Sequence, residues 1–285
     1  MLWENLKCQD FPAAVNAAKG VCVIPLGAME KHGLHMGVGT DSLLAEEIAK
    51  RAAAIEPVVI FPTFCFGHVN GLQHMDGSIC LSNRLILDYM TELCREIARS
   101  GFKKILLLNG HGGNIFLFKT FCNSTIEEQK DYTVSFANFY DKSDMKTLHD
   151  AICRDKSAFP YLTQTDIDTV AGYCAQPMEA GHADFWETII LMDVRPEAVD
   201  VSMMDKEDGR STHRMDHLSQ DGIYSPYVWI GNQPKSHQAS FHPGANERIG
   251  RAMMQLLTED TAKIFKTMKE DNELLAYNDE WNAQW

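Results

Sequence analysis

Short, uniformly apolar segments that alternate with longer amphipathic segments fill the first 140 residues, and this alternation constrains the fold more than any other feature. The apolar segments have the length and composition of strands, at residues 20–26, 57–61, 104–108 and 132–140. The intervening patterns predict helices at residues 42–54, 83–100 and 116–128. Strands that are apolar throughout must be covered on both sides. The sequence therefore predicts an α/β fold with a mainly parallel central sheet and helices on both of its faces.

The pattern weakens after Asp141. Residues 141–180 look polar and irregular, and residues 183–192 look helical until Arg195-Pro196. A loop is predicted for residues 221–243 and a long amphipathic helix for about 243–269. Because no repeat or linker is apparent, we expect one α/β domain over residues 1–285, with an acidic tail that packs on a neighbour or frays.

Composition excludes several classes of protein. Of 285 residues, 45% are hydrophobic and 23% are charged, which is typical of a globular protein. Twenty-six Lys and Arg against 39 Asp and Glu give a net charge of −13, which argues against a nucleic-acid partner or an anionic membrane surface. No apolar run approaches the ~18 residues of a membrane span, and the first residues do not resemble a signal peptide. The eight cysteines form no C-x-x-C pair, which favours reduced thiols in the cytoplasm.

Candidate metal ligands gather in the segment PLGAMEKHGLHMGVGTD, residues 25–41. Glu30 and His32 are two positions apart, so in extended backbone both project to one face and form a plausible half-site for a divalent metal. Asp41 stands where the next helix begins and is a candidate ligand. The alternative is that Asp41, or Thr40 before it, is only a helix cap. Glu30 and His32 have the alternative of being a solvated loop pair. His35 lies in the same loop as a candidate ligand, a supporting partner of a ligand or a surface residue, and the supporting role is the one we expect.

A second motif, KKILLLNGHGGN at residues 103–114, breaks from an apolar strand into a Gly-rich turn. It places His111 at the carboxyl end of a buried strand, with Asn109 as a candidate supporting residue. The closely spaced glycines, Gly112 and Gly113 among them, indicate unusual backbone angles or the close approach of a ligand. A phosphate cradle is the main alternative, although neither common phosphate-loop motif is present.

The third motif is EAGHADFWET, residues 179–188. His182 precedes a predicted helix and Glu187 lies in its first turns, so both can reach the same side of the sheet. The alternative is that Asp184 and Glu187 are simply acids favoured by the positive end of a helix. Glu179 is a candidate for contact with a substrate.

Together the three motifs supply five candidate ligands and one further imidazole, His182. Mixed imidazole and carboxylate ligands suit zinc, manganese or iron better than magnesium or calcium. Five ligands with one bridging carboxylate would hold two ions ~3.5–4 Å apart, as in binuclear hydrolases. Zincin and serine-hydrolase motifs are absent from the sequence. The candidate ligands are Glu30, His32, Asp41, His111 and Glu187.

At these residues the sequence resembles the creatininase family, the creatinine amidohydrolase-like proteins. Family members read P-x-G-S-x-E-Q-H-G-P-H-L-P-L-G-T-D, then N-G-H-G-G-N, then G-H-A-x-x-x-E-T, and this chain follows that order over roughly residues 5–260. In the first loop Leu34, Met36 and Gly37 replace the usual residues without removing a ligand. Creatininases proper instead resemble N-G-H-Y-E-N, so Gly112 and Gly113 stand where they have Tyr and a ligand Glu.

The resemblance implies a three-layer α/β/α sandwich, commonly a hexamer, and two divalent ions per chain, zinc paired with zinc, manganese or iron. It implies that Glu30 and His111 bind one ion, that His32 and Glu187 bind the other, and that Asp41 bridges them. His182 is placed to move a proton to the leaving nitrogen, since an imidazole titrates near neutral pH. Main-chain amides at Gly112 and Gly113 are candidates to stabilise the oxyanion.

The sequence thus predicts a binuclear metal-dependent amidohydrolase that uses a metal-bound hydroxide on a small amide, cyclic amide or formamide. The alternative is a non-catalytic metal- or nucleotide-binding module on the same sheet. The N-G-H-G-G-N subgroup also resembles formamide deformylases of cofactor pathways and enzymes that trim small peptides. The pocket walls are expected from residues 141–180 and 210–242, so the sequence does not identify the substrate.

Overall fold

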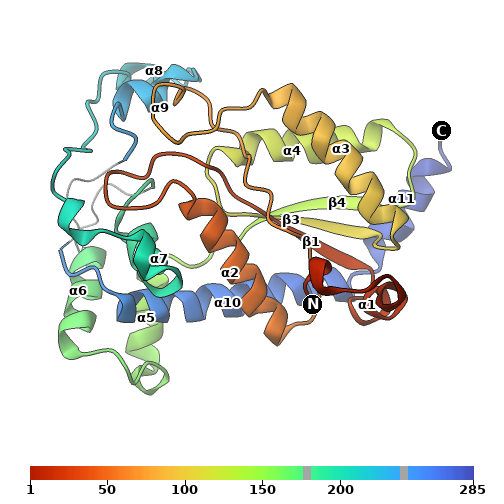
Figure 1. The fold of residues 1–285 in the computed structure, drawn as a ribbon, viewed down its shortest axis with the longest axis horizontal. Coiled ribbons are helices and arrows are strands. Elements are labelled where there is room, and N and C mark those ends of the chain that lie inside the picture. Colours follow the sequence, from red (N-terminus) through yellow and green to blue (C-terminus); the bar gives the residue numbers. More distant parts are fainter. Residues whose placement is uncertain (176–180, 238–242) are drawn as a thin grey trace.

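The computed structural model describes residues 1–175, 181–237 and 243–285, and in these residues a parallel sheet forms the centre of the molecule (Figure 1). Its strands lie in the order β2-β1-β3-β4, and every neighbouring pair is parallel. The register pairs Leu26 with Asn109 and Asn109 with Asn138, so three strands end level. The four predicted strands are confirmed, mostly with shorter ends: β1 Val21–Leu26, β2 Val59–Ile60, β3 Lys104–Asn109 and β4 Thr133–Asn138.

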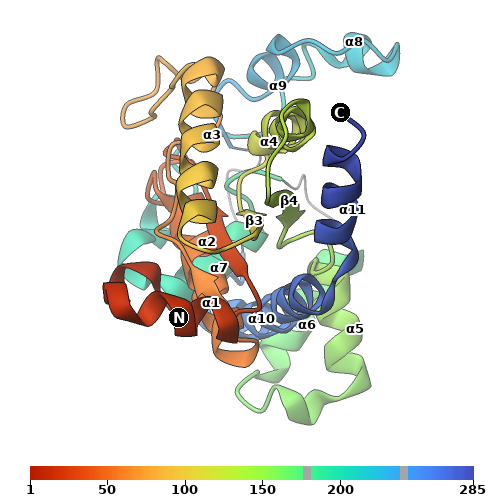
Figure 2. The ribbon, with the colours of Figure 1, turned by 90° about the vertical axis from the view of Figure 1, so that its right-hand side faces the viewer.

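Helices cover both faces of the sheet, which confirms the three-layer α/β/α sandwich (Figure 2). In β1, Val21 and Val23 belong to the core shared with α2, α7 and α10, whereas Cys22 and Ile24 face the core shared with α1, α3 and α4. The alternation follows from the two-residue period of a strand. These helices are α1 Phe11–Ala17, α2 Thr40–Ile55, α3 Asn83–Arg99, α4 Asn114–Ser124, α7 Phe185–Val194 and α10 Glu247–Glu270.

The prediction of an irregular segment at residues 141–180 is wrong, because two helices lie there: α5 Met145–Arg154 and α6 Gln164–Ala175. Leu148 and Ile152 bury one stripe of α5. In α6, Asp166 accepts hydrogen bonds from Arg248 and Asn246 beside α10. The apolar stripe and the Asp144 N-cap of α5 were local signals that the prediction did not use. The pattern of α6 is weaker, and tertiary contacts stabilise such a short helix more than its own propensity does.

One further departure concerns a predicted loop, and the tail follows one of its two predicted alternatives. The segment 221–243 contains the short helix α9 Tyr227–Asn232, which follows α8 Asp216–Gln220. The acidic tail forms α11 Glu273–Asn282, which packs near β4 instead of fraying (Figure 2). Asn278 and Asn282 both donate to the carbonyl oxygen of Lys130, at 2.7 Å each. The tail is therefore docked on the body of the protein.

All eight cysteines are free thiols, and Cys22 and Cys94 are buried. In the parts of the chain that the structure describes, no helix is long and apolar enough to cross a membrane.

Candidate metal centre

Three loops meet at the carboxyl edge of the sheet. The loop after β1 carries Glu30 and His32, and the turn after β3 carries His111. The segment before α7 carries His182. The level ends of β1 and β3 start two of these loops at the same height, so side chains far apart in sequence converge. The structure brings together all five predicted ligands and His182, and all are buried except the half-buried Glu187.

The loop between β1 and α2 doubles back on itself. Gly33 has φ of 62°, a conformation that suits glycine at a tight turn, and an isolated bridge joins His32 to Met36 across it. The backbone N–H of Glu30 donates to the carbonyl oxygen of Val38 at 2.9 Å. This loop is therefore a closed hairpin rather than a solvated strand end, and it holds Glu30 and His32 in the interior.

Asp41 faces both imidazoles of the β1 and β3 loops. Its Oδ2 lies 2.9 Å from His111 Nδ1, and its Oδ1 lies 3.1 Å from His32 Nε2. The N-cap of α2 is Gly39, and Asp41 is the second residue of the helix, so Asp41 does not cap it. Glu30 Oε1 lies 3.2 Å from His111 Nδ1, and Glu187 Oε2 lies 3.7 Å from His32 Nε2. The two oxygens of Asp41 thus face two different halves of the cluster.

Each imidazole is oriented by a backbone carbonyl. His32 Nδ1 bonds to the carbonyl oxygen of Glu30 at 3.0 Å, His111 Nε2 to that of His68 at 2.9 Å, and His182 Nε2 to that of Lys31 at 2.8 Å. A carbonyl oxygen only accepts, so these ring nitrogens carry the hydrogen. The other nitrogen of each ring faces a carboxylate oxygen, and that contact needs a proton or a metal ion between the two atoms.

The pKa values show how strongly the cluster attracts cations. Burial by itself lowers the pKa of His32, but Asp41 foremost and then Glu187 raise it to about 10. His111 behaves similarly, because Glu30 and Asp41 outweigh burial and raise its pKa. Burial raises the pKa of Glu187 to about 8. The metal-free cluster therefore holds extra protons, which a divalent cation would displace.

The residues present fit a pair of metal ions. Two groups of three ligand atoms, each within 4.8 Å of one another, share Asp41: one adds Glu30 and His111, and the other adds His32 and Glu187. Asp41 Oδ2 is buried and lacks a well-formed hydrogen bond although His111 is close, as expected for an oxygen aimed at a cation. A third group joins His182 to Glu30 and His32. Nitrogen and oxygen donors of this kind suit zinc or manganese.

A second ring of residues holds the ligands from behind. Asn109 accepts from the backbone N–H of His111 at 3.2 Å and donates to its carbonyl oxygen at 2.8 Å, so it shapes the turn that carries this imidazole. His35 Nε2 lies 3.0 Å from the hydroxyl of Thr188, the residue next to Glu187. Both residues lie where the sequence analysis expected supporting groups.

The start of α7 separates two roles that the sequence left open. Asp184 is the N-cap, which accepts from the N–H groups of Glu187 at 3.0 Å and Gly181 at 2.9 Å. Glu187 instead directs its carboxylate toward His32 and accepts from the backbone N–H of Ala183 at 2.5 Å. The helix-end explanation therefore holds for Asp184, while Glu187 belongs to the cluster.

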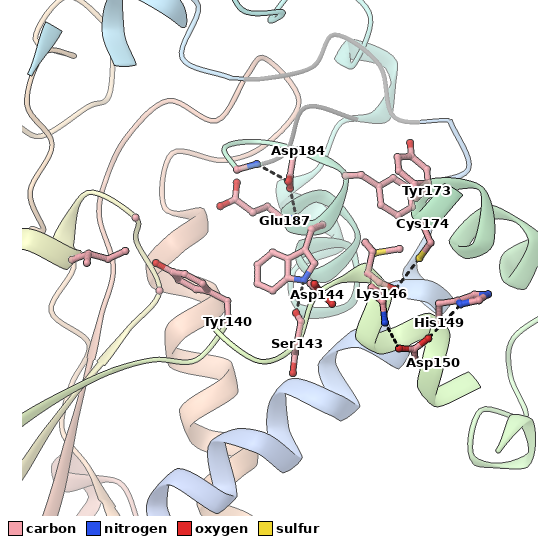
Figure 3. Close-up of a pocket in the computed structure, with 17 residues that line it drawn as sticks. Tyr140, Ser143, Asp144, Lys146, His149, Asp150, Tyr173, Cys174, Asp184 and Glu187 are labelled. Atoms are coloured by element: carbon pink, nitrogen blue, oxygen red, sulfur yellow. Dashed lines mark hydrogen bonds and ion pairs between the residues drawn. The ribbon is translucent and has the colours of Figure 1, made fainter. Parts of the chain in front are cut away.

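A cavity of about 780 Å³ opens beside the cluster (Figure 3). Glu187 and Tyr140 lie at one end of it in this view, and Lys146, His149 and Asp150 of α5 at the other. The wall that α5 and α6 provide lies within residues 141–180, where a pocket wall was expected, whereas none of the described residues of 210–242 lines the cavity. The sequence analysis missed Tyr140. An aromatic residue just after a strand at the ligand edge was the only available signal for Tyr140.

The two glycines after His111 differ in position. Gly112 lines the cavity, and a Cβ built on it would meet nothing within 4 Å. A Cβ on Gly113 would instead collide with the His111 ring and lie 2.6 Å from the carbonyl oxygen of His68. Gly113 therefore permits close packing and adds no space to the cavity. Glu179, the third candidate for substrate contact, lies outside the described residues.

Comparisons with known proteins identify the family. The creatininase family, described as creatinine amidohydrolase, matches residues 4–265. This chain belongs to the creatininase family. The creatinine amidohydrolase of Pseudomonas putida is 24% identical over 207 residues, which are 69% of this chain and 73% of that protein. Membership assigns the chain to the metal-dependent hydrolases of carbon–nitrogen bonds, as its motifs predict.

Other relatives of this creatininase-family chain match it over shorter stretches. The mycofactocin precursor peptide peptidase of Mycobacterium tuberculosis is 28% identical over 103 residues, which are 33% of this chain and 41% of that protein. Solved creatininases share the fold: a variant complexed with creatine has a TM-score of 0.71 at 18% identity, and a manganese form has 0.70 at 20%, each covering 95% of this chain and 99% of the other. A Zn-Zn form has a TM-score of 0.70 at 19% identity and covers 95% and 98%.

Proposed function

We propose that this protein is a binuclear metal-dependent amidohydrolase that acts on a small amide, cyclic amide or formamide. The observation that carries the proposal is the position of Asp41, whose two oxygens face two separate groups of imidazole and carboxylate ligands. One carboxylate shared in this way is the usual bridge of a two-ion hydrolase.

The proposed roles divide the cluster between two ions. Glu30 and His111 would hold one ion, His32 and Glu187 would hold the other, and Asp41 would hold both. Such a pair supplies Lewis-acid polarisation of a carbonyl group and lowers the pKa of a water molecule toward neutrality. The backbone carbonyls behind His32 and His111 fix the tautomer of each ring, so the ligand nitrogen needs no reorientation when an ion binds.

His182 is proposed to move the proton. Its Nε2–H is held by the carbonyl oxygen of Lys31, and its Nδ1 faces Glu30 Oε1 at 3.4 Å at the edge of the cluster. With one nitrogen fixed as a donor, the other is the ring's only acceptor of a proton, and it can pass that proton to a leaving nitrogen. The amides of Gly112 and Gly113 stay weaker candidates for stabilising the oxyanion.

Zinc or manganese is the proposed metal, because both occur in the solved relatives and both suit this donor set. Iron stays a candidate for one position. A cytoplasmic location is supported by eight free thiols in one chain. A homo-oligomer, hexameric by resemblance, is proposed on the family likeness alone.

A non-catalytic metal-binding module is the competing proposal, and the large cavity beside Glu187 argues against it, since a purely structural site needs no open approach. The test combines metal analysis of the purified protein with assays on linear amides, cyclic amides and formamides. Two ions per chain together with turnover of one substrate class support the hydrolase, whereas two ions without turnover of any class support the module.

Two variants separate ligand from proton carrier. Asp41→Asn removes the shared carboxylate and should lose bound metal, whereas His182→Ala should keep both ions and lose turnover. Two tightly bound ions in the Asp41→Asn variant would contradict the bridging role.

A further inference from the structure

Tyr140 stands at the junction between the metal centre and the cavity. It follows β4 by two residues, and its side chain lines the cavity together with Gly112 and Glu187 (Figure 3). Its ring packs edge-to-face against Phe139 and Trp186, at centroid distances of 5.5 and 6.3 Å. Rings packed on two sides fix the direction in which a phenol group points.

The hydrogen bonds around the phenol leave its hydrogen unused. Its oxygen lies 3.4 Å from the amide nitrogen of Asn109, which can only donate. That nitrogen has two hydrogens and two nearer acceptors, the carbonyl oxygen of His111 at 2.8 Å and Asn138 Oδ1 at 2.9 Å. Within the described residues, no hydrogen bond uses the O–H of Tyr140 as donor. A half-buried donor on a cavity wall without an acceptor is suited to bind a ligand.

The phenol is a neutral donor at this position. A tyrosine has an ordinary pKa of about 10, so it carries its proton at neutral pH. The space next to Gly112 on the cavity wall is open, because a Cβ at this position would meet nothing within 4 Å. A substrate in this space can approach the phenol of Tyr140 and the ligand cluster at the same time.

We propose that Tyr140 is a catalytic residue whose phenol donates a hydrogen bond to the carbonyl oxygen of the amide as negative charge develops on that oxygen. The inference rests on the proposed function. No proton is transferred: the O–H bond of Tyr140 stays intact, and the bond to the substrate shortens as the charge grows. Donors placed at a developing oxyanion contribute more to the transition state than to substrate binding.

The cavity contains a matched control, Tyr173 of α6. Its ring stacks on Phe185 at a centroid distance of 3.8 Å, and its hydroxyl donates to the carbonyl oxygen of Pro243 at 3.4 Å. This phenol therefore lines the same cavity, but its hydrogen is already used. Tyr173→Phe removes one cavity hydroxyl without removing the proposed donor.

The experiment compares metal-loaded wild type, Tyr140→Phe and Tyr173→Phe on the best substrate of the amide and formamide panel. Tyr140→Phe should lower kcat by roughly 10²-fold with KM within about threefold of wild type, while Tyr173→Phe should stay near wild type. A second readout is the Kd of phenylboronic acid, which becomes tetrahedral when it takes up hydroxide. That Kd should weaken for Tyr140→Phe and not for Tyr173→Phe, with two ions per chain in each protein.

Three outcomes overturn the inference. One is a Tyr140→Phe kcat and boronic acid Kd within about threefold of wild type. Another is loss of bound metal in Tyr140→Phe, which would make the phenol part of the structure of the metal site. An equal loss of activity in both variants would assign the effect to cavity packing. If wild type with two ions hydrolyses no amide or formamide, the proposed function fails together with this inference, which distinguishes that failure from the other three.

Discussion

Adding one methyl group at Gly113 tests how the metal centre depends on backbone packing. Gly113 has φ of −61° and ψ of −24°, which alanine adopts without strain, so any effect of Gly113→Ala comes from its Cβ. That atom would collide with the His111 ring and lie 2.6 Å from the carbonyl oxygen of His68, the acceptor that orients this ring. Overpacking of this kind costs about 1–3 kcal/mol.

The expected effects are measurable on stability and on metal binding. The entropy of unfolding is about 2.1 cal/mol/K per residue, which gives roughly 0.6 kcal/mol/K for the whole chain. A loss of ~1–3 kcal/mol in the free energy of unfolding therefore lowers Tm by about 2–5 °C. Displacing a group that orients a ligand weakens metal affinity by about 10–100-fold. Thermal unfolding of the metal-free protein measures the first effect, and zinc competition against a chromophoric chelator measures the second.

The neighbouring Gly112→Ala is the matched control, because its Cβ would meet nothing within 4 Å. It should keep the Tm and the zinc affinity of wild type. The reasoning is refuted if Gly113→Ala binds zinc as tightly as wild type, or if both alanine variants lose affinity equally.

Four shorter predictions follow from the same structure. Chelation should abolish hydrolysis and lower Tm, since ions that bind only the folded chain stabilise it; an unchanged Tm contradicts this. Lys104→Met should cost ~1–3 kcal/mol in urea unfolding, because Lys104 Nζ donates to the carbonyl oxygens of Met268 and Asp271 at the end of α10. Lys103→Met removes only the ion pair of a half-buried lysine with Asp131 and should cost under ~1 kcal/mol. Hydrogen bonding to Arg248 lowers the pKa of Asp166 in the folded protein. The Asp166 carboxylate therefore stabilises the fold at any pH above its unfolded pKa of about 3.9, and this contribution is lost as the pH falls below that value toward the lower pKa of the folded state. Asp166→Asn should be less stable than wild type at pH 7 and approach wild type in acid. Creatinine should rank below larger amides by kcat/KM, because so small a molecule leaves much of the cavity of about 780 Å³ without contacts.

The sequence determined the sheet, the layers and the types of ligand. Apolar strands such as residues 104–109 and the motifs after them are local patterns, because the ligand residues Glu30 and His111 follow β1 and β3 within a few positions. The rule that parallel strands place their ends at one edge then brings Glu30 and His111 together without any knowledge of distance. These features were predictable because each depends on a few consecutive residues.

The tertiary structure decided which of two roles each ambiguous residue has. Asp41 and Asp184 both occupy the start of a helix, and only the contacts show that Asp184 caps α7 while Asp41 faces His32 and His111. A carboxylate at such a position has the same local sequence in either role. The choice depends on whether imidazoles from other loops or a nearby backbone N–H lie within reach, and that is set by the packing of distant segments.

The walls of the cavity also required the three-dimensional structure. Helices α5 and α6 depend on contacts such as Arg248 with Asp166, which join residues 82 positions apart. Tyr140 gains its place in the site because the register of β4 against β3 puts it beside Asn109. The sequence by itself determined which chemical groups are present at the sheet edge. Only the tertiary structure decided their separations, the protonated nitrogen of each ring and the shape of the space beside them, because these depend on long-range packing rather than on local pattern.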